Sequence, residues 1–232
     1  MTAPKLDQYW AAIAAAVPQF SPEEQTAAVT LYRELARGSP VSAEQLAAAL
    51  HVRPAKAREL LERPCIKAFV YPDEQGRVLG FGGLAAAPMH HRFEVGGRTL
   101  WTWCAWDALF IPEILGADAL VESSDPVSGV PVRLTVTRDG VAAVEPPSAV
   151  ISFLLPDAEE FTKSATNVMA KFCHYGFFFA SMETGEHWTA KHPGTFLYAI
   201  DDAVELGRRL NARSFGRELR TAVPRARPTS GG

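Results

Sequence analysis

The sequence has few cysteines and no long hydrophobic run. Its 232 residues include only Cys65, Cys104 and Cys173, which are too far apart for a disulfide framework or a CxxC zinc site. The longest uncharged stretches, such as 9–22 and 172–182, fall short of the roughly 20 apolar residues that a membrane helix needs. We therefore expect a soluble, cytoplasmic protein with free thiols.

The sequence also lacks a large excess of charge of one sign and the common motifs of nucleotide-binding proteins and hydrolases. The 23 Lys and Arg against 26 Asp and Glu give a net charge of −3, which argues against bulk attraction to nucleic acid or anionic lipid. GxGxxG, a P-loop, GxSxG and HExxH are all absent, so nucleotide-dependent and ordinary serine-hydrolase chemistry lose their usual support. The Ala-rich run 10–17 is weakly hydrophobic and runs directly into a helix pattern, so we do not expect a secretion signal.

What is present begins with a small N-terminal module, predicted to span residues 1–84. Capping residues and apolar spacing predict helices at 21–37, 42–50 and 54–61, and two strands at 67–71 and 77–84 follow. Three helices and a hairpin make a winged-helix-like module, a pattern typical of DNA-binding proteins.

The third of these helices contains basic residues that favour a DNA-binding interpretation: Arg53, Lys56, Arg58 and Arg63. The same segment also contains Glu59 and Glu62, so a solvated, mixed-charge helix face is the simpler interpretation. Both interpretations remain open at this point.

Residues 85–222 are predicted to form a larger mixed domain, which makes the fold class α+β. The predicted strands are 92–95, 98–101, 119–124, 130–137, 142–145 and 149–154, and the predicted helices are 106–115, 158–169 and 203–220. Residues 172–181 form a strand or another buried run. The tail 223–232, rich in Pro, Arg and Gly, is predicted to be disordered.

The segment around Cys104 is the best candidate for chemistry. A strand passes into a helix predicted to begin near Ala105, and a helix N-terminus favours a thiolate. Asp107 would then lie on the same helix face as Cys104, and desolvation by the neighbouring tryptophans would raise its pKa and suit it to acid–base work. The alternative is a buried structural cysteine beside a helix-capping aspartate.

Cys173 lies in a second aromatic segment and, taken alone, is best interpreted as a core cysteine. His174 is its neighbour, but adjacent residues in a strand point to opposite faces. We therefore do not expect a Cys-His protease.

Taken together, these segments resemble the organomercurial (alkylmercury) lyases of bacterial mercury-resistance systems. The similarity rests on the Cys-x-x-Asp sequence of 104–107 with its aromatic surroundings and on the distant Phe-Cys-His of 172–174. Further similar segments occur in the same order at 33–42, 128–132, 144–146 and 188–192. The resemblance covers about residues 20 to 220.

The resemblance implies that Cys104 and Cys173 are the mercury-binding thiols and that Asp107 handles the proton. Such an enzyme cleaves the carbon–mercury bond by protonolysis and forms a hydrocarbon and Hg(II). Mercury is a soft metal and prefers thiolates. Trp103 and Phe172, beside the thiols, are expected to form walls of the substrate pocket, although filling the core is their alternative role.

The resemblance also implies partners. No cofactor is expected, and Hg(II) is bound only as the product. Cellular thiols such as glutathione or cysteine would remove that ion for turnover, and a mercuric reductase would accept it. Neither nucleic acid nor membrane is an expected partner. The charge balance and the short apolar stretches argue against both, and in the family the N-terminal module packs against the catalytic domain and does not read DNA.

The sequence departs from the family pattern in two places. A cysteine that many members carry near the turn 123–126 is missing, which threatens packing more than activity, and His174 replaces a further cysteine of some relatives. Cys65 has no family role. A thiol-based, DNA-binding metal sensor and a non-catalytic mercury scavenger are the alternatives, but neither explains Asp107 together with the aromatic segments.

Overall fold

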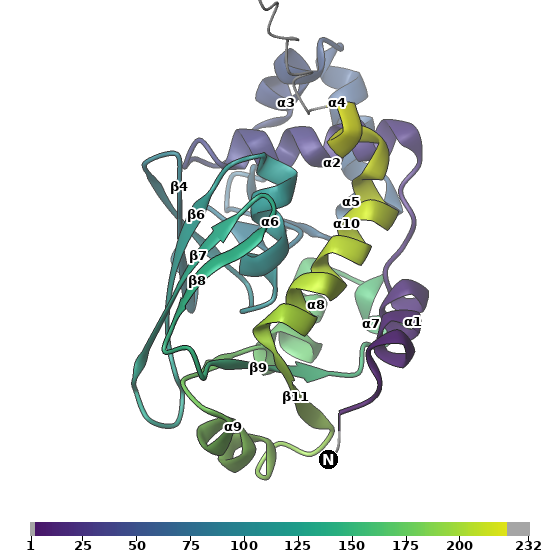
Figure 1. Cartoon of the computed structure of the whole chain (residues 1–232). Coiled ribbons are helices and arrows are strands. Elements are labelled where there is room, and N and C mark those ends of the chain that lie inside the picture. The colour runs from purple at the N-terminus through teal and green to yellow at the C-terminus, as the bar shows by residue number, and fades with distance from the viewer. Residues whose placement is uncertain (1–2, 222–232) are drawn as a thin grey trace, which may run out of the picture.

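The computed structural model describes residues 3–221, and its strands form two antiparallel sheets (Figure 1). The larger sheet has eight strands in the order β1-β2-β3-β5-β4-β6-β7-β8, and the smaller has the order β10-β9-β11. The strands are β1 (Val70–Pro72), β2 (Val78–Phe81), β3 (Leu84–Ala85), β4 (His91–Val95), β5 (Arg98–Thr102), β6 (Ala119–Ser124), β7 (Pro131–Thr137), β8 (Gly140–Glu145), β9 (Val150–Leu154), β10 (Phe178–Phe179) and β11 (Thr195–Ala199). With the helices below, they confirm the α+β class.

The longest helix of the described residues connects the other parts of the fold. It is α10, and it contacts α6, α2, α1 and strands of both sheets (Figure 1). The helices are α1 (Leu6–Ala16), α2 (Pro22–Leu35), α3 (Ala43–Leu50), α4 (Pro54–Glu62), α5 (Pro64–Lys67), α6 (Asp107–Leu115), α7 (Ala158–Phe161), α8 (Ala165–Lys171), the 3₁₀ helix η1 (Cys173–Tyr175), α9 (Met182–Thr189) and α10 (Ile200–Thr221).

The N-terminal helices begin where their caps predict. Ser21 accepts a hydrogen bond from the Glu24 N–H while the Glu24 carboxylate accepts one from the Ser21 N–H, and Pro22 occupies the first helical position. Ser42 and Gln45 form the same reciprocal pair at the start of α3. These two predicted helices are confirmed to within two residues at either end.

The strands of the N-terminal part belong to the same sheet as those of the larger part. Residues Leu84 and Ala85 of β3 pair with Thr102 and Trp101 of β5, directly before Cys104. The domain boundary at residue 84 therefore falls inside a continuous sheet, and the division into two domains remains a prediction. The sheet runs on from the winged-helix-like module to the segment that carries the first candidate thiol.

Several predicted elements are divided or differ in kind. The predicted helix 158–169 is two helices, because Ser164 caps a new helix through the Asn167 N–H. The predicted strand 77–84 is interrupted at Gly82 and Gly83, which both have positive φ. The predicted strand 67–71 begins as the helix α5, with Pro64 at its first position.

Four elements were not predicted: α1, α5, α9 and β11. The run 172–181, predicted to be a strand or another buried run, is a 3₁₀ turn followed by the short strand β10. Within residues 3–221, no helix combines the length and apolar character that crossing a bilayer requires. The predicted disordered tail 223–232 lies outside the described residues.

Candidate active site

Cys104 lies in the turn between β5 and α6 and is held there by backbone hydrogen bonds. Its carbonyl accepts a hydrogen bond from Thr102 Oγ1 at 2.9 Å, and the next N–H, of Ala105, donates to the Gly176 carbonyl at 3.0 Å. The Cys104 side chain is 1% exposed. The turn is therefore fixed both to its own strand and to the segment that follows Cys173.

Cys173 comes from a distant part of the chain and meets Cys104 in the core. It begins the turn η1 directly after α8 and is buried. The two sulfurs and a carboxylate oxygen of Asp107 all lie within 4.8 Å of one another. In the part of the chain that the structure describes, no other cluster of three potential metal ligands is found.

Asp107 is the first residue of α6 and points back toward Cys104. Its Oδ2 accepts a hydrogen bond from the Cys104 backbone N–H at 2.8 Å, and a carboxylate oxygen lies within 4.8 Å of the Cys104 sulfur. Gly83 makes room for it: a Cβ at this position would lie 2.4 Å from Asp107 Cγ, and its φ of +102° favours glycine. The Gly82–Gly83 break in the sheet therefore accommodates the carboxyl group.

Burial controls the electrostatics of the three groups. It raises the pKa of Asp107 to about 7, although the hydrogen bonds from Cys104 favour the carboxylate. Burial, the hydrogen bond with Cys173 and the charge of Asp107 raise the pKa of Cys104 well above its ordinary range. For Cys173, the hydrogen bond from Cys104 lowers the pKa, but burial and Asp107 outweigh it and the net shift is upward. Both free thiols therefore carry their protons at neutral pH.

The expected helix effect on Cys104 is wrong in direction. The helix α6 begins at Asp107, within two residues of the predicted start, so Cys104 lies three residues before it, and burial raises the pKa of its thiol where the helix was expected to lower it. The contact between Cys104 and Asp107 is made by the turn, and not by two residues on one helix face. The predicted upward shift of the Asp107 pKa is confirmed.

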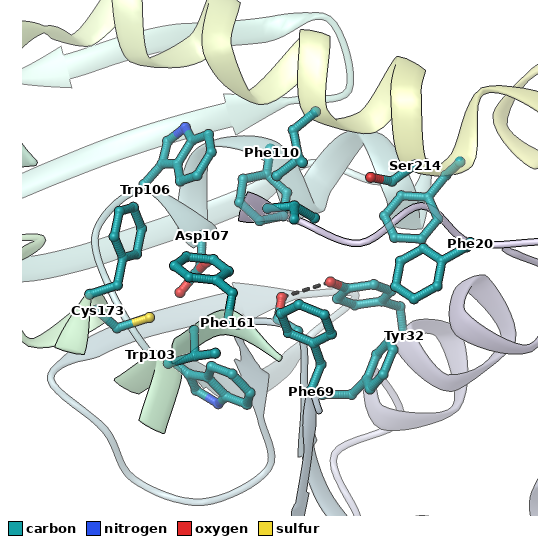
Figure 2. Close-up of a pocket in the computed structure, with 18 residues that line it drawn as sticks. Phe20, Tyr32, Phe69, Trp103, Trp106, Asp107, Phe110, Phe161, Cys173 and Ser214 are labelled. Carbon is teal, nitrogen blue, oxygen red and sulfur yellow. Dashed lines mark hydrogen bonds between the residues drawn. The ribbon is translucent and has the colours of Figure 1, made fainter. Parts of the chain in front are cut away.

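A cavity of about 70 Å³ opens beside the cluster. Figure 2 shows the Cys173 sulfur and the Asp107 carboxyl facing this aromatic-walled space. Trp103 and Phe172 both line it, and their role as walls of a substrate pocket stays a prediction. The lining is almost entirely apolar, so an organic group next to the thiols would be screened from water.

Comparison with known proteins gives a consistent result. The family model for alkylmercury lyase matches residues 84–212. An alkylmercury lyase from Streptomyces lividans is 42% identical over 180 residues, which cover 78% of this chain and 79% of the relative. Those from Staphylococcus epidermidis and Pseudomonas putida are 39% and 38% identical, over 79% and 80% of this chain and 80% and 84% of their own lengths. The chain belongs to the alkylmercury lyase family.

A solved structure agrees with the fold expected of an alkylmercury lyase. The crystal structure of the mercury-bound form of MerB2 matches with a TM-score of 0.69 and 22% identity, over 89% of this chain and 97% of that one. This likeness, which covers most of both chains, shows that they share the fold.

The remaining cysteine and histidine of interest lie outside the cluster. Cys65 is half-buried on α5, and burial followed by the charge of Glu24 raises its pKa. His174 is exposed while Cys173 is buried, so it points away from the site as expected, although a 3₁₀ turn and not a strand turns it outward. Neither residue joins the two thiols.

One residue of the cavity, Tyr32, comes from the N-terminal part of the chain and was not predicted. Tyr32 lines the cavity, and its hydroxyl donates to the Gly82 carbonyl at 2.6 Å (Figure 2). The pair Gly82–Gly83 was the available signal, because glycine inside a strand often marks a close approach by another group.

Proposed function

We propose that this chain is an organomercurial lyase in which Cys104 and Cys173 bind mercury and Asp107 moves the proton. The observation that carries the proposal is the buried cluster of two thiols and one carboxyl, beside an apolar cavity. Family membership supplies the reaction class, and the cluster supplies the groups that this reaction needs.

The bond changes balance with the groups present. One thiol gives up its proton and its sulfur bonds to the mercury of R–Hg⁺; the second thiol does the same. One of the two protons is transferred to carbon as the carbon–mercury bond breaks, and the other leaves to solvent. The products are the hydrocarbon R–H and Hg(II) held by two thiolates, which are the ligands that a soft metal prefers.

Asp107 is suited to transfer that proton. A carboxyl with a pKa of about 7 exchanges protons readily at neutral pH, and its oxygen lies within 4.8 Å of both sulfurs. We infer that its carboxylate first takes a thiol proton and then returns it to the carbon. Trp103 and Phe172 would exclude water from this step and hold the organic group.

Turnover then requires removal of Hg(II). A bis-thiolate complex is displaced by attack of another thiolate more readily than by dissociation, so cellular thiols such as glutathione or cysteine would release the ion. We propose a mercuric reductase as the final acceptor, the cytoplasm as the site of action, and no cofactor beyond these thiols.

The charges of α4 do not favour the DNA-binding sensor. Lys56 pairs with Glu23 at 3.1 Å and with Glu59 at 2.9 Å, and Arg63 pairs with the same two carboxylates at 2.6 and 3.0 Å. Arg58 pairs with Glu44. These cations are neutralised within the protein, so the face that suggested DNA binding is a network of surface ion pairs.

The test is hydrocarbon release. Purified protein is incubated with methylmercury or phenylmercury and excess small thiol, and methane or benzene is followed by headspace gas chromatography. We expect catalytic release by the wild type and by Cys65→Ala, and none by Cys104→Ala or Cys173→Ala. Mercury binding without any hydrocarbon would indicate a scavenger or a sensor, and would overturn the proposal.

A further inference from the structure

Ser152, in the middle of β9, is a buried polar residue that the reaction does not use directly. It is 0% exposed, and its hydroxyl and its backbone N–H both form hydrogen bonds to the loop 175–177. Its hydroxyl donates to the Tyr175 carbonyl at 2.6 Å and accepts from the Phe177 N–H at 3.1 Å. Its own N–H donates to the Phe177 carbonyl at 3.0 Å. Ser152 therefore binds the peptide groups on both sides of Gly176.

Gly176 connects the two thiol-bearing segments. Its N–H donates to the Cys173 carbonyl at 3.0 Å, and its carbonyl accepts the Ala105 N–H at 3.0 Å. It also packs directly on the first thiol, since a Cβ added to it would lie 2.9 Å from Cys104 Cβ and 3.3 Å from Cys104 Sγ. The place of this one residue sets how closely the two cysteines approach.

A second buried side chain reaches the same residue from the larger sheet. His91 is 1% exposed; its Nδ1 lies 2.8 Å from Ser123 Oγ, and the backbone of Gly176 lies close enough to the ring to affect its pKa. Burial lowers the pKa of His91 to about 3, so the ring is neutral and does not change its charge near neutral pH. Gly176 therefore lies between a loop that is hydrogen-bonded to β9 and a buried ring of β4.

We propose that Ser152 is a positioning residue that fixes the separation of the Cys104 and Cys173 sulfurs by holding the loop 175–177. The inference rests on the proposed function, because the separation matters only if both sulfurs bind one mercury. Misplacement of a reacting group by about 1 Å can lower a rate about 10²-fold. The substrate can still bind through one thiol when the loop is loose, so kcat should fall more than KM rises.

The test compares Ser152→Ala with Thr195→Val. Thr195 is a matched control because it is 1% exposed, lies in the same sheet, and donates its hydroxyl to a backbone carbonyl, that of His192, at 2.6 Å. This hydrogen bond involves neither the segment of Cys104 nor that of Cys173. Both variants lose one buried hydroxyl, and thermal unfolding measures how much each is destabilised.

Two readouts distinguish positioning from stability. The first is kcat and KM for methylmercury, and the second is X-ray absorption of bound Hg(II), which reports the sulfur ligands. For Ser152→Ala we expect kcat to fall by about 10- to 100-fold, KM to change by less than about threefold, and the two-sulfur signal to weaken. Thr195→Val should keep both readouts at the wild-type level. Equal kcat and equal mercury spectra in the two variants would overturn the inference.

Gly176→Ala provides a second route if Ser152→Ala does not fold. It keeps every hydrogen bond of Ser152 and pushes directly on Cys104, so it should also weaken the two-sulfur signal and lower kcat. A wild-type spectrum in Gly176→Ala would overturn the inference. Failure of the proposed function is separate, because the wild-type protein itself would then show no cleavage.

Discussion

Two buried aspartates show how one residue type acquires opposite properties. Asp107 is 7% exposed and Asp125, in the turn after β6, is 2% exposed. Burial raises the pKa of Asp107 to about 7, where only Cys104 donates to it. Burial also tends to raise the pKa of Asp125, but four hydrogen bonds reverse this and the net shift is downward.

The four donors to Asp125 come from both sides of the turn. Oδ1 accepts from the N–H groups of Val127 and Ser128, at 2.8 and 3.1 Å. Oδ2 accepts from the Ala180 N–H at 2.9 Å and from the Thr184 hydroxyl at 2.6 Å. The number of donors, and not burial alone, therefore decides whether a carboxyl stays ionised as a structural anchor or remains able to exchange a proton.

The largest expected effect is on turnover. Asp107→Asn removes the group that moves the proton, and we expect kcat to fall by about 10²- to 10⁴-fold. Asp125→Asn should leave kcat per folded molecule within about threefold of wild type, because the side chain is outside the cluster. Hydrocarbon release measures both. Comparable losses in the two variants would break the distinction between the aspartates.

The same pair should change stability in opposite directions. Asp125→Asn places an NH₂ group against N–H donors, so we expect the free energy of unfolding at pH 7 to fall by about 3 kcal/mol. Chemical denaturation measures this loss. A neutral effect of Asp125→Asn would show that the hydrogen bonds of the turn do not anchor it.

Asp107→Asn should instead have a larger free energy of unfolding than the wild type, and this difference should grow as pH rises. The folded carboxyl keeps its proton up to about pH 7, whereas the unfolded one loses it near the ordinary value of 3.8, so the wild type loses stability from about pH 4 to pH 7. By proton linkage this loss amounts to about 4 kcal/mol at pH 8. The advantage of Asp107→Asn over wild type in urea unfolding should therefore be small at pH 4 and largest at pH 8.

The pH dependence of activity tests the same pKa. If the Asp107 carboxylate takes the thiol proton, kcat/KM should rise with pH through about 7, and at pH 6 it should be about tenfold below its plateau. The wild type and Cys65→Ala should give the same curve. A profile that is flat between pH 5.5 and 8 would contradict the role of Asp107 as base.

The smallest effect concerns a single donor to Asp125. Thr184→Val removes one of the four hydrogen bonds, and because the side chain is only half-buried we expect a loss of about 1 kcal/mol in the free energy of unfolding. The pKa of Asp125 should also rise, so the loss should shrink as pH falls below 4. A loss that does not depend on pH would show that Thr184 acts through packing alone.

Local rules were sufficient where the signal lies in neighbouring residues. Caps and apolar spacing located the helices that follow Ser21 and Ser42, and the strands predicted at 92–95 and 98–101 are confirmed as β4 and β5. They were not sufficient at 158–169, where Ser164 starts a second helix within an otherwise helical pattern. Nor did they predict β11, a strand that pairs with β9, which lies far from it in the sequence.

The sequence by itself determined the chemistry that this protein has available. It supplies the soft ligands, the carboxyl three residues after Cys104 and the aromatic residues around them. Only the tertiary structure decided that Cys173 meets Cys104, that Gly83 leaves room for Asp107 and that Ser152 forms hydrogen bonds to the loop 175–177. The physical reason is that pKa and ligand geometry depend on burial and on contacts between residues far apart in the chain, which local sequence patterns do not specify.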